Sequence, residues 1–244
     1  MKKWDIRLLI LSRGRSNSIT TTKVFPDWVE VLVPDDEEAL YKAKVKNPIL
    51  TIPAEVKGLG EVRNWVLEHF SEEIVVMIDD DIARLYCLTG ERSLEISDPD
   101  EVVQVVINTA VMAKDLGIHV FGFSQTDIRK YNGTEPFTLA SWVGGVIGVI
   151  GRKYTFRKDK YKVDIDYCLQ NLLVDRILWQ DNRYLFSQKR DNNKGGNSLF
   201  RTETDFNKSV QSLKDKWGDN INVGTFKGQI KIRLNVKRRQ AIEL

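Results

Sequence analysis

Residues 74–81 read IVVMIDDD, and they carry the strongest structural signal in the chain. Five consecutive apolar residues, Ile74–Ile78, are typical of a strand that is buried on both faces in the middle of a parallel sheet. Three aspartates, Asp79, Asp80 and Asp81, follow this strand directly. Ligands of open α/β sheets bind beyond the carboxyl ends of the strands, so we expect a functional site here.

Strand-like and helix-like patterns alternate along the first half of the chain, which favours an α/β fold. We expect a Rossmann-related, mixed but mostly parallel central sheet flanked by helices, in a single domain that spans residues 1–244. The expected strands are 7–12, 28–33, 49–52, 74–78, 118–123, 137–151, 183–186 and 229–236, and the expected helices are 16–24, 37–45, 61–70, 99–116, 164–174 and 202–217.

Composition excludes several classes of protein. The 37 Lys and Arg residues against 34 Asp and Glu give a formal charge of only +3, so net charge alone does not indicate a nucleic-acid partner. Two cysteines, Cys87 and Cys168, are too few for a disulfide framework or a tetrahedral zinc site. The apolar run at Leu8–Leu11 is too short for a signal segment or a membrane span. We therefore expect no membrane association and a cytoplasmic location.

The three aspartates are suited to binding a divalent cation. Side chains alternate along an extended chain, so Asp79 and Asp81 are expected to project to one side and Asp80 to the other. Two carboxylates that project together suit Mg²⁺ or Mn²⁺, which keep some waters and bind substrate phosphates. The alternative is a solvated acidic turn, because aspartate is common in turns.

Several short motifs resemble those of a known group of enzymes. IVVMIDDDI resembles the strand and Asp-x-Asp motif of glycosyltransferases with the GT-A fold. The whole chain is most similar to the phage TET-associated glycosyltransferases, through SRGRS, GEVRN, MIDDDI, DIDYCLQ and NNKGGN, in this order over about residues 5–200. The resemblance implies a GT-A-like fold. It also implies transfer of a sugar from a nucleotide sugar, UDP-linked, to a hydroxymethyl pyrimidine such as hydroxymethylcytosine in DNA, with Mn²⁺ or Mg²⁺ as cofactor.

The resemblance also implies which residues bind the nucleotide-sugar donor. Residues 1–125 would form the donor-binding half, and residues 126–244 the acceptor-side half with a basic C-terminal tail. The implied donor-binding residues are Ser12, Arg13, Arg15, Arg63, Asn64, Asp79, Asp80, Gly144, Gly145 and Lys194, with Asp81 and Asp79 as metal ligands. Of these, Arg63 is expected to reach the diphosphate and Asn64 to shape the pocket. The alternatives are a solvated basic turn at 12–15, exposed helix residues at 63–64, a packed strand of small residues at 144–145 and an ordinary surface loop at 192–197.

An acidic pair, Asp164 and Asp166, opens an expected helix. In an inverting enzyme of this fold, one carboxylate of such a pair takes the proton of the acceptor hydroxyl. We prefer Asp166 as this catalytic base because it matches the second acid of the pair in related enzymes, although Asp164 is nearly equivalent. Acids at this position also cap helices, which is the structural alternative.

Many relatives use a late histidine as a third metal ligand. This chain has only His69 and His119, and both precede the acidic pair. The third ligand is therefore missing, or an Asn or Asp near residues 191–197 replaces it.

Two basic stretches favour DNA, modified and either double- or single-stranded, as the acceptor. One precedes the acidic pair and the other lies near the C-terminus; together they contain Arg152, Lys153, Arg157, Lys158, Lys160, Lys162, Lys227, Lys231, Arg233, Lys237, Arg238 and Arg239. We expect Arg152, Lys153, Lys158, Arg238 and Arg239 to contact phosphates. Three aromatic residues, Tyr154, Phe156 and Tyr161, interleave with the first stretch and are suited to stacking on a displaced base.

Other functions compete with this interpretation. Each basic stretch is alternatively a solvated face. The acceptor is alternatively a protein or glycan, and the same fold also serves nucleotidyltransferases. A non-catalytic domain that binds nucleotide or DNA is a further alternative, but the intact acidic pairs argue against it.

Overall fold

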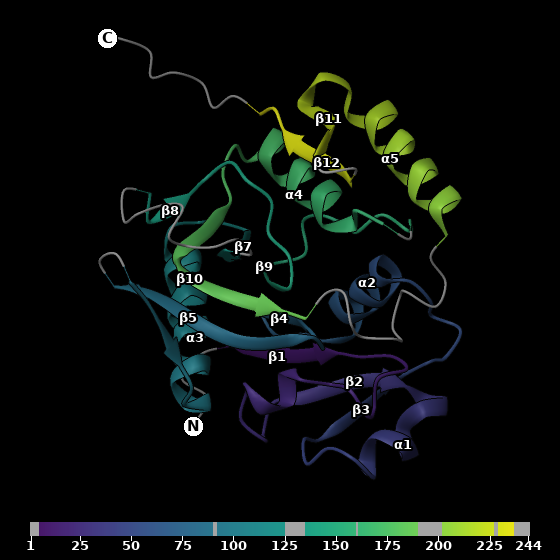
Figure 1. The fold of residues 1–244 in the computed structure, drawn as a ribbon, viewed down its shortest axis with the longest axis vertical. Helices are drawn as coiled ribbons and strands as arrows, with labels where there is room; N and C mark the ends of the chain where they lie inside the picture. Colours follow the sequence, from purple (N-terminus) through teal and green to yellow (C-terminus); the bar gives the residue numbers. More distant parts are fainter. Residues whose placement is uncertain are drawn as a thin grey trace.

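A computed structural model of the protein describes residues 5–89, 92–124, 135–159, 161–189, 202–226 and 229–236 (Figure 1). The elements in these ranges are β1 (Ile6–Leu11), η1 (Thr21–Lys23), β2 (Glu30–Pro34), η2 (Asp35–Glu37), α1 (Glu38–Lys42), β3 (Ile49–Ile52), α2 (Leu59–His69), β4 (Ile74–Asp79), β5 (Ile82–Thr89), β6 (Arg92–Ile96), α3 (Pro99–Asp115), β7 (Val120–Ser124), β8 (Phe137–Thr138), β9 (Val146–Ile150), α4 (Val163–Val174), β10 (Trp179–Gln188), α5 (Glu203–Trp217), η5 (Gly218–Asn220), β11 (Ile221–Phe226) and β12 (Gln229–Leu234).

One large sheet organises the molecule. Its strand order is β3-β2-β1-β4-β9-β7-β10-β5-β6, and β8 pairs with β10 outside this path. The first four strands are parallel, while β9 is antiparallel to both of its neighbours, β4 and β7. Strands β7 and β10 are parallel, so most of the central strands run in one direction. The predicted α/β fold with a mixed, mostly parallel sheet is confirmed.

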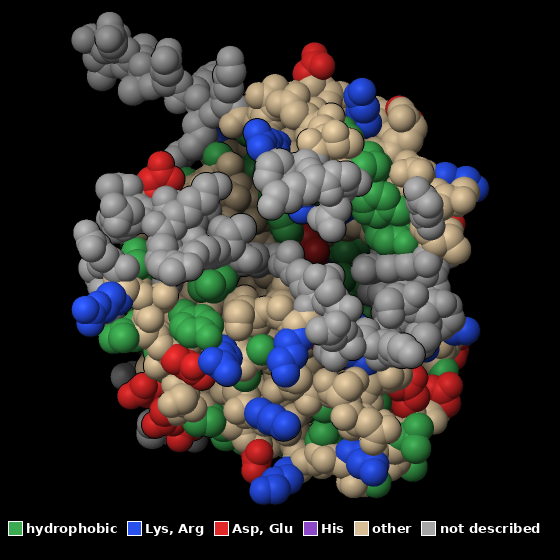
Figure 2. Space-filling view, viewed as in Figure 1, with side chains coloured by type: hydrophobic (Ala, Val, Ile, Leu, Met, Phe, Trp, Pro, Cys, Tyr) green, Lys and Arg blue, Asp and Glu red, His purple; other side chains and the backbone are tan. Residues whose placement is uncertain are grey.

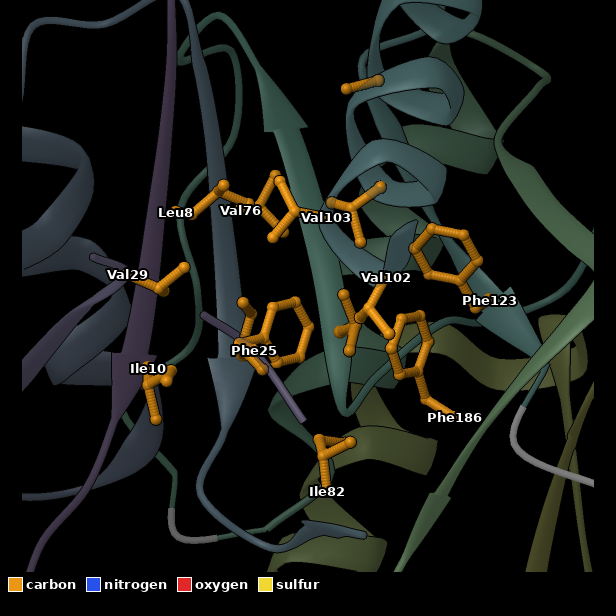
Figure 3. Packing of buried hydrophobic residues seen from close by; sticks show 14 of the residues in the cluster. Leu8, Ile10, Phe25, Val29, Val76, Ile82, Val102, Val103, Phe123 and Phe186 are labelled. Carbon is orange, nitrogen blue, oxygen red and sulfur yellow. The ribbon is translucent and has the colours of Figure 1, made fainter. Parts of the chain in front are cut away.

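Helices cover both faces of this sheet. On one face, α3 packs against β1, β4 and β7 through a cluster that includes Val76, Val102 and Phe123, which Figure 3 shows at close range. On the other face, α2 and α4 pack against the same strands through a cluster that includes Val66, Met77 and Leu172. Ile74–Ile78 therefore contributes side chains to both clusters, as the unbroken apolar run predicted.

The last described part of the chain, residues 202–226 and 229–236, forms a C-terminal module of α5 and the β11–β12 hairpin. It has a small apolar core of its own with α4, formed by Ile165, Leu169, Val210, Leu213, Ile221 and Ile232. Figure 1 shows the module against α4, at the end of the molecule opposite α1 and β3. The module is thus joined to the sheet domain through α4.

Two expected elements differ from the structure. The helix expected at 16–24 is a series of turns and the short η1, because Thr20 and Thr21 bond to other parts of the chain. Their amides donate to the Asp80 carbonyl, and their hydroxyls donate to the carbonyls of Ile82 and Asp79. The strand expected at 137–151 is instead two strands, β8 and β9.

In the described ranges, no helix combines the length and the apolar character needed to cross a membrane.

Candidate functional site

The candidate site lies where β4 ends. Asp79 is the last residue of β4 and pairs in register with Leu11, the last residue of β1. The Asp79 amide donates to the Gly145 carbonyl at 2.7 Å, which joins this strand end to the turn that leads into β9. Figure 2 shows a hollow in the middle of this view of the surface, with acidic atoms at its base.

Asp80 is turned away from solvent and holds the loop that follows β1. Its carboxylate accepts from Ser12 Oγ at 2.6 Å and forms an ion pair with Arg15. Tyr41 completes the network, since its hydroxyl lies 2.6 Å from Ser12 Oγ and accepts from the Arg15 amide at 3.0 Å. Burial raises the pKa of Asp80, against the opposing effects of Arg15 and Ser12. Burial likewise raises the pKa of Tyr41 to about 12.

Asp79 has a different set of partners. Its carboxylate accepts from Gln188 Nε2 at 3.1 Å and lies 3.4 Å from Arg63 Nη2. Gly145 makes room for this arrangement, because a Cβ at that position would lie 2.7 Å from Gln188 Nε2. Gly145 also has a φ of +72°, a conformation that other residues rarely adopt.

Arg63 connects the aspartates of β4 to the start of α4. Its Nη1 forms an ion pair with Asp164, while Nη2 faces Asp79. The Arg63 side chain is fully buried, and burial lowers its pKa. Asp79 and Asp164 keep 29% and 23% of their side-chain surface exposed, so both are accessible to a ligand. The structure thus brings together an acid from each predicted half of the chain.

Asp166, the preferred catalytic base in the sequence, points elsewhere. Its carboxylate is fully buried and accepts from Lys216 Nζ at 2.7 Å, Trp217 Nε1 at 2.8 Å and Gln170 Nε2 at 2.8 Å. Two of these donors belong to α5, so Asp166 attaches the C-terminal module to α4. The geometry therefore favours Asp164 over Asp166 as the residue nearer to substrate.

Two predicted donor-binding residues, Arg13 and Asn64, make hydrogen bonds within the protein. Arg13 donates to the Ala54 and Val56 carbonyls, which holds the segment after β3. Asn64 exchanges two hydrogen bonds with the Phe156 backbone, at 2.8 Å and 2.7 Å, which holds the segment before α4. None of these hydrogen bonds involves Asp79.

Two of the predicted DNA-contacting residues, Arg152 and Lys153, lie away from the aspartates of β4. Arg152 follows β9, whose last residue pairs with Ile74 at the start of β4, so it lies at the end opposite the aspartates. There it donates to the Leu67, Phe70 and Glu72 carbonyls, and the adjacent Lys153 pairs with Asp175. Lys158 is exposed in the segment that precedes α4. Lys194, Arg238 and Arg239 lie outside the described residues.

The charges at the site fit a divalent cation. Four carboxylates, those of Asp79, Asp80, Asp81 and Asp164, meet two guanidinium groups, those of Arg15 and Arg63. Two formal negative charges remain, and hard carboxylate oxygens are the ligands that Mg²⁺ and Mn²⁺ prefer. In the described ranges, no group of three or more His, Cys, Asp or Glu side chains is arranged to hold a metal. A cation there would therefore take ligands from substrate or water as well.

Sequence reasoning missed three members of this site. Gln188, which contacts Asp79, lies at the end of β10, a strand expected to end at residue 186. Tyr41 was expected only as part of a helix. Phe156, whose ring lies 5.3 Å from the Arg63 guanidinium, was expected to stack on a base. The role of Phe156 as a neighbour of Arg63 follows from the burial of Arg63, and the sequence did not predict that burial.

The fold and the sequence can be compared with known proteins. Glucosyl-3-phosphoglycerate synthase from Mycobacterium tuberculosis, in complex with Mg²⁺ and UDP, is 15% identical with a TM-score of 0.54 over 94% of this chain and 86% of that one. Its complex with Mn²⁺, UDP-glucose and phosphoglyceric acid is 14% identical with a TM-score of 0.52 over 93% and 86%. These likenesses show that the chain has the predicted GT-A fold. A search of curated proteins gave no significant match.

A sequence model of one family, described as TET-associated glycosyltransferase, matches residues 6–196, more than three quarters of the chain. The match begins at β1 and extends past β10, so it includes every strand of the large sheet and the aspartates after β4. It ends before the C-terminal module. The chain belongs to the TET-associated glycosyltransferase family.

Proposed function

We propose that this glycosyltransferase moves a sugar from a UDP-linked donor to a hydroxymethyl pyrimidine in DNA. The observation that carries the proposal is the position of Asp164, which faces Asp79 across the buried Arg63. A candidate base on the acceptor half is thereby held next to the predicted metal ligands of the donor half. Membership of the TET-associated family supports DNA as the acceptor.

The donor would lie at the carboxyl end of β4 and β1, with residues 1–125 as its binding half. Asp79 and Asp81 would hold Mg²⁺ or Mn²⁺, which neutralises the charge that develops on the departing diphosphate. Support comes from the solved glucosyl-3-phosphoglycerate synthase complexes, which contain these ions together with UDP or UDP-glucose. Ser12 and Arg15 would shape the nucleotide pocket through their contacts with Asp80.

In an inverting reaction, Asp164 would act as general base. Its carboxylate would accept the proton of the pyrimidine hydroxymethyl group while that oxygen forms a bond to C1 of the sugar. The bond from C1 to the diphosphate oxygen breaks, and its electron pair leaves with UDP. Partial exposure of Asp164 leaves one side of the carboxylate accessible to an acceptor.

Charge distribution supports a polyanionic acceptor on the C-terminal side, within the acceptor half 126–244. Residues 202–244 contain nine Lys and Arg against five Asp and Glu, whereas residues 1–201 contain 28 against 29. The whole positive net charge of the chain therefore belongs to its last 43 residues. Lys231 and Arg233 are exposed on β12, and they are opposite Gly224 and Asn222 of β11. A basic β-ribbon of this kind is suited to DNA phosphates.

Donor chemistry and acceptor chemistry can be tested separately. Incubation of the protein with UDP-sugars is expected to give slow hydrolysis that requires Mn²⁺ or Mg²⁺ and stops with EDTA. Addition of hydroxymethylated duplex DNA should convert this hydrolysis into sugar transfer, while unmodified duplex should not. Hydrolysis that is equally fast with EDTA would contradict the metal assignment. Transfer to protein or glycan, with none to hydroxymethylated DNA, would contradict the acceptor.

A further inference from the structure

We propose that Arg63 is a positioning residue that fixes Asp164 relative to Asp79, and that it does not bind the donor diphosphate. This inference rests on the proposed role of Asp164 as the base. It replaces the expectation from sequence that Arg63 reaches the diphosphate. The two roles differ in what they require of the guanidinium: a ligand-binding arginine must be accessible, whereas a positioning arginine must be buried with its terminal nitrogens paired to the groups that it positions.

The guanidinium meets the second requirement. Its side chain has no exposed surface, and each of its terminal nitrogens faces a carboxylate from a different element. Asp79 belongs to β4 and Asp164 to α4, so the arginine on α2 spans the two sides of the site. A buried charge is stable only when it is paired, and here two partly exposed acids provide the pairing.

A rigid set of contacts holds the guanidinium in place. Its carbon lies 5.3 Å from the centre of the Phe156 ring, and that ring stacks on Tyr167 of α4 at 3.9 Å. Asn64, the neighbour of Arg63, fixes the Phe156 backbone through two hydrogen bonds. Gly60 lets the Arg157 carbonyl approach α2 closely, since a Cβ would overlap that oxygen. Arg63 is thereby fixed by α2, by the segment before α4 and by α4 itself.

Lysine cannot replace this arrangement. A guanidinium is planar and presents donors in a fixed fork, so it can engage two carboxylates in defined directions. A lysine ammonium is a single point of charge on a flexible stem, and it would pair with one acid and release the other. An Arg63→Lys protein keeps the charge near the donor, yet it loses the fixed relation between Asp79 and Asp164.

The chain contains a matched control in Arg7. This arginine also bridges two acids, Glu30 and Glu72, and its guanidinium carbon lies 4.7 Å from the centre of the Phe70 ring. It is on β1 opposite Val75, four residues before Asp79 along β4, or about 13 Å away at the usual rise of a strand. Arg7→Lys therefore breaks the same type of bridge at the opposite end of the sheet.

The test compares steady-state transfer by Arg63→Lys and Arg7→Lys, with donor concentration varied at saturating Mn²⁺ and hydroxymethylated DNA. For Arg63→Lys we expect kcat to fall about a hundredfold, because the base is misplaced, while the donor KM stays within about twofold. Arg7→Lys should retain both parameters. A donor KM that rises about tenfold with kcat retained would show that Arg63 binds the diphosphate, and would overturn the proposal. Equal kcat losses in both variants would also overturn it.

A double mutant tests whether Arg63 acts through Asp164. If it does, Arg63→Lys should cause little further loss of kcat in an Asp164→Asn background, whereas independent roles would give multiplied losses and contradict the proposal. If Arg63→Lys does not fold, Phe156→Leu removes the ring that lies next to the guanidinium, together with its stack on Tyr167. It should lower kcat at unchanged donor KM, and a wild-type kcat or a raised donor KM would overturn the inference. A wild-type protein that transfers no sugar would instead contradict the proposed function.

Discussion

At the scale of single residues, consecutive aspartates have different partners. Asp79 faces Arg63 and Gln188, Asp80 is buried against Ser12 and Arg15, and Asp81 lies 3.7 Å from Arg15. Asp80 and Asp81 lie in the turn between β4 and β5, where the alternation of a strand no longer applies, and both carboxylates pair with Nη1 of Arg15. Asp80 therefore stabilises the loop after β1, and Asp79 and Asp81 remain as the proposed cation ligands.

Asparagine substitutions at the two acids of α4 should affect different properties: kcat for Asp164 and the free energy of unfolding for Asp166. Asp164→Asn removes the proposed base, so we expect kcat to fall by about 10² or more with folding retained. Asp166→Asn removes a carboxylate that pairs with Lys216, so we expect a loss of about 1–3 kcal/mol in the free energy of unfolding and a nearly normal kcat. Urea unfolding and initial-rate assays check the pair. The assignment is wrong if Asp166→Asn abolishes transfer in a stable protein.

A substitution at Asp81 tests the cation site. Asp81→Asn should weaken binding of a UDP-sugar in the presence of Mn²⁺ by at least about tenfold, because one charged ligand is lost. Asp175→Asn is a suitable control, since Asp175 pairs with Lys153 at the opposite end of the sheet and should leave binding unchanged. Calorimetric titration with and without Mn²⁺ provides the measurement. Unchanged Mn²⁺-dependent binding in Asp81→Asn would exclude this site.

The sequence predicted the strand that leads to the aspartates better than it predicted the contacts of individual side chains. An apolar run followed by acids is a local pattern, and it correctly indicated a central strand that ends at Asp79. The partners of Arg63 and Asn64 are 101 and 92 residues away, at Asp164 and Phe156, so no local pattern reveals them. Whether an arginine is buried depends on such distant contacts.

At the scale of elements, α2 is the part of the fold on which the site depends most. It contributes Arg63, and its Asn64 fixes the segment that leads to α4. The expected helix at 61–70 agrees closely with α2, because its apolar residues recur with helical spacing. The prediction of a helix at 16–24 was wrong because the hydroxyls and amides of Thr20 and Thr21 bond to the backbone around Asp80.

Close packing between α2 and the segment before α4 gives a stability prediction. Gly60→Ala should destabilise the protein although alanine favours a helix by about 1 kcal/mol, since overpacking costs about 1–3 kcal/mol and the obstacle is backbone. Gly224→Ala is the matched control, because a Cβ there meets open space. Thermal unfolding of both variants checks this. A Gly60→Ala protein as stable as wild type would show that the segment moves aside freely.

At the scale of the whole molecule, a sheet domain contains the proposed chemistry, and residues 202–244, which include the C-terminal module, carry the excess positive charge. Asp166 connects the two, because its carboxylate binds Lys216 and Trp217 of the module. The sequence predicted the α/β sheet from its alternating patterns. It did not predict the β5–β6 hairpin or β11. These strands are defined by their pairing with neighbouring strands, which local patterns in the sequence do not reveal.

Charge reversal on the hairpin tests the proposed DNA contact. Replacing Lys231 and Arg233 together by Glu should weaken binding to duplex DNA and reduce the dependence of the binding constant on salt, because phosphate contacts are lost. Metal-dependent hydrolysis of the donor should be unaffected. Lys44→Glu and Lys46→Glu together serve as the control, since both residues are exposed in the segment between α1 and β3. Equal losses in both double variants would exclude a specific role for the hairpin.

Mass spectrometry of nucleosides is the most direct test of the proposed function. Hydroxymethylated DNA would be incubated with the protein, Mn²⁺ and a panel of nucleotide sugars, then digested to nucleosides. We predict that one UDP-sugar adds the mass of a single sugar to the hydroxymethyl pyrimidine, and that this product disappears with EDTA or in the Asp164→Asn protein. Hydroxymethyl nucleosides that stay unmodified with every donor, while the same protein transfers sugar to another acceptor, would contradict DNA as the substrate.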